Sequence, residues 1–157
     1  MAINRVCMKL SALSVTAFFC LSLFACKGQS QVIDEAASTL RHFYISYITE
    51  HCKTADIPNT SPTLKDNLKK IDSLVNAIAT NNLREQLKEQ DEAGYDFFIN
   101  SNNCSVEWLK TINVSKDVAS ENIYVVTYVN EYPVEKKIIK LRMVKRGSVF
   151  LIDRILR

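Results

Sequence analysis

Residues 123–156 read IYVVTYVNEYPVEKKIIKLRMVKRGSVFLIDRIL, and their pattern predicts most of a β-sheet. Its first part, Ile123–Val129, is rich in β-branched and aromatic residues, which favour strands. Alternation along it places Tyr124, Val126 and Tyr128 on one face. A period of two residues predicts a half-buried β-strand.

Further strands flank this one. Alternation along Val134–Val144 predicts two different faces. The apolar face has Ile139, Leu141 and Met143, and the basic face has Lys136, Lys140 and Arg142. Gly147-Ser148 predicts a tight hairpin turn, and Val149–Leu156 the last strand. Ile112 and Val114 indicate a shorter first strand. Together these segments predict a four-stranded antiparallel meander.

The preceding part of the chain has helical spacing. Apolar residues recur along Val32–Cys52 with the helical period: Ile33, Ala36, Ala37, Leu40, Phe43, Tyr44, Tyr47 and Ile48. Lys53–Pro62 is polar and predicts a loop. A second helix is predicted from Ser61-Pro62, with this apolar stripe: Leu64, Leu68, Ile71, Val75 and Ile78. Asn81-Asn82 is predicted to break it, before a shorter helix that reaches about Glu92.

Helices first and strands last predict an α+β domain, in which N-terminal helices pack on the antiparallel meander. No internal repeat or linker divides this part of the chain. We therefore predict one α+β domain over residues 32–157.

The first residues have the pattern of an export signal. Arg5 and Lys9 are followed by 16 uncharged residues, Leu10–Ala25. As a helix this segment would extend about 24 Å, short of the ~30 Å hydrocarbon core of a membrane. A short apolar run after positive charges predicts a signal peptide over residues 1–25.

Leu23-Phe24-Ala25-Cys26 resembles the bacterial lipobox. The resemblance implies cleavage between Ala25 and Cys26, and attachment of lipid to the Cys26 thiol. Residues 26–31 would then form a lipidated tether. More than one acyl chain gives stable membrane anchoring.

Removing the signal changes the charge balance. The whole chain has 20 Lys and Arg against 17 Asp and Glu, a net charge of +3. The signal contains two of the basic residues and no acid, which leaves a net charge of +1. This near-neutral balance argues against a nucleic-acid partner.

A family resemblance extends over about residues 40–156. It rests on four motifs: Phe43-Tyr44-Ile45-Ser46-Tyr47-Ile48 before Cys52, Tyr95-Asp96-Phe97-Phe98-Ile99-Asn100, Asn103-Cys104 before Trp108-Leu109, and Leu151-Ile152-Asp153-Arg154-Ile155. Their order resembles a family of small lipoproteins, mainly of Gram-negative gut anaerobes, built on one domain of unknown function. The resemblance implies a cystatin-like, or nuclear-transport-factor-like, roll. The family has no established activity, so the resemblance assigns no catalytic residue to this chain. Phe97 departs from the family, which often has proline there.

The chain has five cysteines. Cys7 and Cys20 lie in the signal and Cys26 in the lipobox, so Cys52 and Cys104 either pair or remain separate buried thiols. The family resemblance places a cysteine at both positions and thereby favours a disulfide. His42, His51 and Cys52 lack the spacing of metal ligands, so we expect no metal site and no cofactor.

Two acids and several aromatic residues are candidates for a pocket. The candidate pocket residues are Tyr44, Tyr47, Tyr95, Asp96, Trp108 and Asp153. Alternatively the aromatic residues, with Tyr124 and Tyr128, form the core. Asp96 would then cap a turn, and Asp153 would pair with Lys140 or Arg142.

Two surface motifs are candidates for an interaction or a modification. The basic run from Lys136 to Arg146 either meets anionic lipid headgroups or forms a solvated face that protects an edge strand. Asp72-Ser73-Leu74 matches an O-glycosylation sequon of gut anaerobes, which makes Ser73 a candidate for modification.

The function expected from these features is that of an envelope lipoprotein with a non-catalytic binding or scaffolding domain. Its partners would be the membrane, through the lipid anchor, and an envelope protein. The expected location is the outer membrane, facing the periplasm, with surface exposure as the alternative. The alternative functions are a pocket-based enzyme or small-molecule binder, and a toxin-neutralising immunity or inhibitor protein.

Overall fold

Helices precede strands along the chain. The computed structural model describes residues 34–55, 57–58, 60–89 and 95–156. The helices in this part are α2 (Glu35–Cys52), α3 (Pro62–Ile78), α4 (Asn81–Lys88) and the 3-10 helix η1 (Val106–Lys110). The strands are β1 (Asn113–Lys116), β2 (Ile123–Glu131), β3 (Val134–Arg146) and β4 (Val149–Leu156). The predicted signal peptide, Cys26 and the tether lie outside the described residues.

The strands form one sheet in the order β1-β2-β3-β4, and each neighbouring pair is antiparallel. The α+β class and the meander predicted from the sequence are therefore confirmed. Strand register brings the apolar residues of neighbouring strands together, with Val126 opposite Ile139 and Leu141 opposite Ile155. All four are buried.

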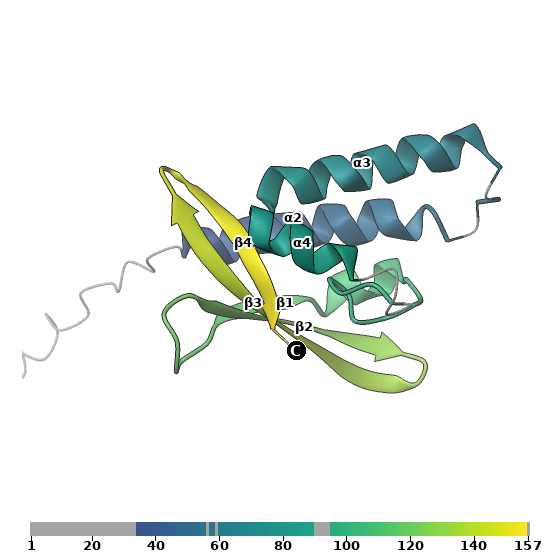
Figure 1. Ribbon diagram of the computed structural model, residues 1–157. Helices are drawn as coiled ribbons and strands as arrows, with labels where there is room; N and C mark the ends of the chain where they lie inside the picture. Colours follow the sequence, from purple (N-terminus) through teal and green to yellow (C-terminus); the bar gives the residue numbers. More distant parts are fainter. Residues whose placement is uncertain (1–33, 56, 59, 90–94, 157) are drawn as a thin grey trace, which may run out of the picture. The chain divides into compact units, whose positions relative to one another are not determined.

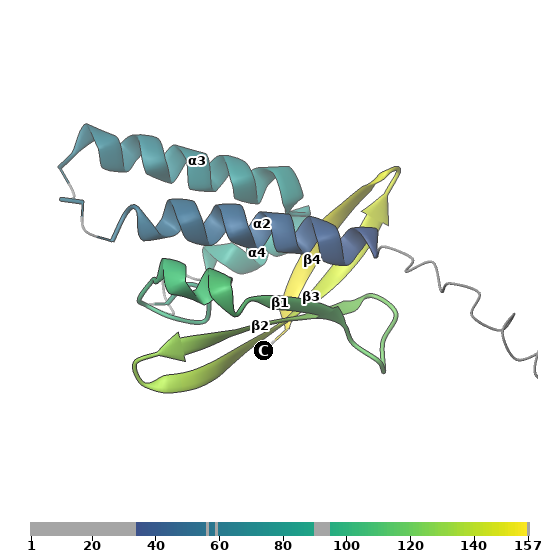
Figure 2. The same ribbon diagram turned by 180° about the vertical axis from the view of Figure 1, so that it is seen from behind.

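The helices cover the apolar face of the sheet. α2 and α3 lie side by side (Figure 1), and α2 also contacts β1, β4 and η1. Figure 2 shows η1 between α2 and the end of β2, both of which it contacts. Leu40, Tyr44 and Ile48 of α2 are fully buried in this core. Burial of a large apolar side chain contributes roughly 1.5–3 kcal/mol, so α2 is the main helix of the core.

The ends of the helices differ from the sequence predictions. α2 begins at Glu35 rather than Val32, because the Asp34 carboxylate accepts the N–H groups of Ala36 and Ala37 and caps the helix. The predicted break at Asn81-Asn82 is wrong, since both residues belong to α4. The break is one step earlier, where the Thr80 hydroxyl accepts the Leu83 N–H.

One residue of the predicted α3 stripe is also misplaced. Leu68 is 46% exposed, whereas Asn67 is buried beside Ile71. A helix advances 100° per residue, so the buried face passes through Asn67 once Ile71 and Ile78 are fixed in the core. Within the described residues, no helix is both long and apolar enough to cross a membrane.

Candidate functional site

The C-terminal end of α2 is tied to a distant loop by a disulfide. Cys52 and Cys104 are joined, with their Cα atoms 5.1 Å apart and a sequence separation of 52. The pairing favoured by the family resemblance is therefore present. Disulfides persist in oxidising compartments, so this bond is typical of an exported domain.

Asp96 organises the turn that precedes this disulfide. Its Oδ1 accepts the backbone N–H groups of Phe98 at 2.7 Å and Ile99 at 3.3 Å. Its Oδ2 accepts the Tyr47 hydroxyl at 2.5 Å, and His51 Nδ1 lies 3.7 Å from the same oxygen. Asp96 thus caps a turn, which is the alternative to a pocket role that the sequence offered. Its hydrogen bond with Tyr47 also links that turn to α2.

Burial raises the pKa of the tyrosines around Asp96. For both Tyr44 and Tyr47 the pKa is raised first by burial and then by the negative charge of Asp96. Tyr128 donates to the Ile99 carbonyl, and burial raises its pKa as well. Among the described residues the Tyr44 hydroxyl has no hydrogen-bond partner. These tyrosines are neutral core residues at physiological pH.

Trp108 belongs to the same core. Its ring stacks on Tyr128 with the ring centres 4.5 Å apart, and its Nε1 donates to Asn130 Oδ1 at 3.2 Å. Because it is only 1% exposed, it has no free face for a ligand.

Asp153 lies in a different place and makes different contacts. The register of β3 and β4 shifts between Arg142 and Met143, and this shift leaves Asp153 without a partner on β3. Its Oδ1 accepts the Thr80 hydroxyl and the Asn82 side-chain amide, both at 3.0 Å. The predicted pairing with Lys140 or Arg142 is therefore wrong: the bulge turns the carboxylate toward the junction of α3 and α4.

The six predicted pocket residues therefore do not line one pocket. Tyr44, Tyr47 and Asp96 lie together around the base of the turn, Trp108 is linked to them through Tyr128, and Asp153 is elsewhere. Tyr95 lines a cavity of about 360 Å³, and Tyr47 lines a separate one of about 330 Å³ between α2, α3 and α4. We call the first of these the end cavity, and its lining residues are Tyr95, Phe97, Asn100, Ile138, Ile139, Lys140, Ile155 and Leu156.

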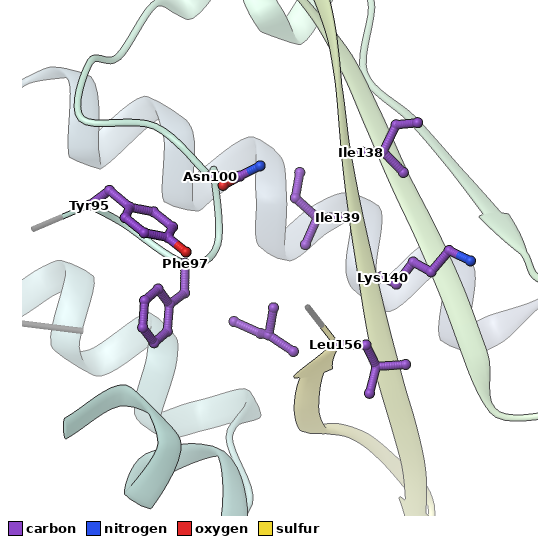
Figure 3. Close-up of a pocket in the computed structure, with 8 residues that line it drawn as sticks. Tyr95, Phe97, Asn100, Ile138, Ile139, Lys140 and Leu156 are labelled. Carbon is purple, nitrogen blue, oxygen red and sulfur yellow. The ribbon is translucent and has the colours of Figure 1, made fainter. Parts of the chain in front are cut away.

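The end cavity lies where β4 stops beside a longer strand. Figure 3 shows Tyr95, Phe97 and Asn100 on one side of it, and Ile138, Ile139 and Lys140 of β3 on the other. Leu156, the last described residue of β4, is opposite Lys140, so among the described residues Val134–Ile139 pair only with β2 in the sheet. We call this stretch of β3 the open edge. The β2–β3 hairpin extends visibly beyond β4 in Figure 1.

Sequence reasoning missed the open edge, although a signal for it was present. The predicted third strand, Val134–Val144, was longer than the predicted fourth, Val149–Leu156. Two strands joined by a tight turn pair residue by residue, starting from that turn. The residues of the longer strand that are farthest from the turn therefore extend beyond the end of the shorter strand. The difference in length alone could have located the exposed half of β3.

Several charges of the basic run are paired. Lys140 lies 3.7 Å from Asp117, Lys137 2.7 Å from Glu135 and Lys145 3.8 Å from Glu35. Ser73, the candidate for glycosylation, is exposed on α3. No group of three or more His, Cys, Asp or Glu side chains in the described part of the chain could hold a metal ion.

Comparison with known proteins places the fold but not the function. No family model and no curated protein matches the chain. The domain is similar to the crystal structure, at 2.10 Å resolution, of a protein of unknown function from Bacteroides thetaiotaomicron VPI-5482. The TM-score is 0.67 and the identity 22%, over 91% of this chain and 99% of the other. At this identity the likeness shows a shared fold.

Proposed function

We propose that the protein is an envelope lipoprotein, anchored through Cys26, whose α+β domain binds a partner protein without catalysing a reaction. The observation that carries this proposal is the Cys52–Cys104 disulfide, because a bond of this kind is expected in an exported protein. It agrees with the export signal and with the Leu23-Phe24-Ala25-Cys26 motif. The resemblance to small lipoproteins of Gram-negative gut anaerobes supports the same assignment.

The proposed location is the outer membrane, with the domain facing the periplasm. Lys27-Gly28-Gln29 follows the lipidated cysteine and contains neither an Asp directly after it nor an acidic run. A tether of residues 26–31 would hold the domain within about 20 Å of the bilayer if fully extended. A partner would therefore be met in the envelope.

Binding rather than catalysis is favoured by how the acids and aromatic residues are used. Asp96 accepts three hydrogen bonds within the fold, and Asp153 accepts two. Trp108 and Tyr44 are buried in the core. Within the described part of the chain, the open edge pairs only with β2, so its outward backbone groups are available to a partner.

The anchor is tested by labelling cells with alkyne-palmitate while they express the full chain in a Gram-negative host. We expect label on the wild-type protein and a mass that corresponds to cleavage before Cys26. The Cys26→Ala variant should carry no palmitate label, and its signal peptide, residues 1–25, should remain uncleaved. Cys20→Ala removes a cysteine from the signal instead, and it should be labelled like the wild type. Equal labelling of Cys26→Ala and the wild type would contradict the proposal.

A further inference from the structure

The orientation of the backbone along β3 can be deduced from its neighbours. The Val129 N–H donates to the Thr111 hydroxyl at 3.0 Å, on the β1 side, so it points away from β3. Val129 is directly opposite Lys136. In an antiparallel pair, opposite residues either exchange both backbone hydrogen bonds or direct both groups away from each other. The N–H and C=O of Lys136 therefore point to the open edge.

Alternation extends this result along the strand. The backbone groups of Ile138 point to the same side as those of Lys136, and those of Lys137 point to β2. A bond at the far end of the strand agrees: Met143, an odd-numbered residue, donates its N–H to Asn122 on the β2 side. The open edge thus directs the N–H and C=O groups of Lys136 and Ile138 outward, in the spacing of a strand.

Side chains on the open edge are exposed and partly apolar. Val134 is 83% exposed and Ile138 53%, and Tyr132 at the hairpin tip is 89% exposed. Lys136 and Lys140 alternate with them on the same face, as β-strand geometry requires. An edge strand that combines apolar side chains and unpaired backbone is a template for another strand.

We propose that the open edge of β3 binds an extended segment of a partner protein as an additional antiparallel strand, in line with β4. This inference rests on the binding role proposed above and specifies its partner. The backbone groups of Lys136 and Ile138 supply the hydrogen bonds. The end cavity, lined by Phe97 and Ile139, receives an apolar side chain from the inward face of the added strand.

Charge specifies the other face of the partner segment. Lys136 lies on the outer face of the open edge; Lys140, which is 3.7 Å from Asp117, follows on the same face, and Arg142 and Arg154 lie opposite each other farther along the sheet. Opposite charges on neighbouring strands are favourable and like charges are not. The partner segment therefore alternates acidic and apolar residues. A second copy of this chain fits less well, because it would bring together two edges that both bear Lys136.

The probe for this test is a fluorescein-labelled synthetic heptapeptide, Asp-Val-Asp-Leu-Asp-Val-Asp, titrated against the full chain in detergent and followed by anisotropy. We expect saturable binding that weakens as salt is added. A peptide with Lys in place of each Asp should not bind. Equal binding of the two peptides, or no binding of the acidic one, would overturn the proposal.

Lys136→Pro removes one N–H from the open edge and none that faces β2. We expect it to weaken peptide binding about tenfold. Lys136→Glu keeps the backbone and reverses the charge, so it tests the same edge even if Lys136→Pro does not fold. We expect it to weaken binding about threefold or more. Unchanged affinity in a folded Lys136→Pro or in Lys136→Glu would contradict strand addition.

Two other occupants are distinguished in the same experiment. Displacement of the peptide by phosphatidylglycerol vesicles would make the surface a lipid-binding face. A dimer of the full chain that Lys136→Pro dissociates would make the occupant a second copy. Either result overturns the inference. Peptide binding and palmitate labelling are measured separately. A negative peptide result would therefore contradict strand addition without affecting the proposed lipid anchor, and a negative labelling result would contradict the anchor without affecting strand addition.

Discussion

The turn before Cys104 and the open edge of β3 lie on opposite sides of the end cavity, and they use their polar groups in opposite ways. In the turn, the Asp96 carboxylate accepts hydrogen bonds from the N–H groups of Phe98 and Ile99, and the disulfide closes the loop covalently. On the open edge, the backbone groups of Lys136 and of the residue two positions after it face outward. The irregular turn is thus closed by hydrogen bonds and a disulfide, whereas this part of β3 pairs on one side only among the described residues.

This difference separates stability from binding. Substitutions in the turn should reduce the free energy of unfolding, because they leave buried groups without partners. Substitutions on the outward side of the open edge should leave stability nearly unchanged and alter affinity for a partner strand.

Loss of the disulfide should reduce stability more than any other change considered below. Replacing Cys52 and Cys104 together by alanine should lower the free energy of unfolding by about 4 kcal/mol, the loop-closure contribution for a loop of this length. Urea unfolding of the full chain in detergent measures it. Wild-type protein treated with a reductant should lose a similar amount. A double variant as stable as the oxidised protein would show that the bond does not constrain the fold.

The next largest loss of stability is expected from Asp96→Ala, which should lower the free energy of unfolding by about 3 kcal/mol. It removes three acceptor contacts and leaves the Tyr47 hydroxyl buried without its partner. Asp96→Asn is the matched control, since its amide oxygen can still accept in the turn, and it should lose less than half as much in the same urea titration. Equal losses in the two variants would mean that charge, not the turn, matters at this position.

Adjacent proline substitutions on β3 test the two sides of the strand directly. Lys137→Pro deletes an N–H that faces β2, and we expect it to cost about 2–3 kcal/mol more than Lys136→Pro. Thermal unfolding followed by circular dichroism measures the difference. Two variants of equal stability would show that the backbone orientation deduced for β3 is reversed or absent.

The smallest effect at neutral pH is expected from Tyr44→Phe. The Tyr44 hydroxyl has no partner among the described residues, so its removal should change stability by less than about 0.5 kcal/mol. Tyr47→Phe removes the donor to Asp96 and should cost more. A large loss in Tyr44→Phe at pH 7 would reveal a partner for this hydroxyl.

At alkaline pH the same variant should behave differently from the wild type. In the folded chain burial raises the pKa of Tyr44, and burial and the Asp34 hydrogen bond raise that of Tyr124 to about 12. Above pH 10 the unfolded chain therefore loses these protons first, and stability falls as pH rises. The slope is at most about 1.4 kcal/mol per pH unit for each such tyrosine. Tyr44→Phe should show a shallower decline in urea titrations between pH 10 and 12.

Much of the fold could be predicted from the sequence, because alternation along β2 and β3 is a local property. Tyr124, Val126 and Tyr128 face the core as predicted. The start of α4 could not be predicted so easily. Its cap, Thr80, is fixed by contacts with the distant strand β4, where its N–H donates to the Ile152 carbonyl and its hydroxyl to Asp153.

The candidate site was harder to predict for the same reason. Asp96 and Asp153 are both acids within apolar stretches, and local sequence does not distinguish their roles. A bulge in β4 and a turn near α2 decide those roles, and both depend on tertiary contacts. The open edge depends on the relative lengths of β3 and β4, which could be read once the strands were paired.

Hydrogen exchange of individual backbone amides can show whether the outward side of β3 is unpaired and whether a peptide strand covers it. Nuclear magnetic resonance of the full chain in detergent can follow the N–H groups of Lys136, Lys137 and Ile138. We predict fast exchange at Lys136 and Ile138, slow exchange at Lys137, and protection of the first two when the acidic heptapeptide is added. Protection of Lys136 and Ile138 without the peptide, or no protection with it, would contradict the account.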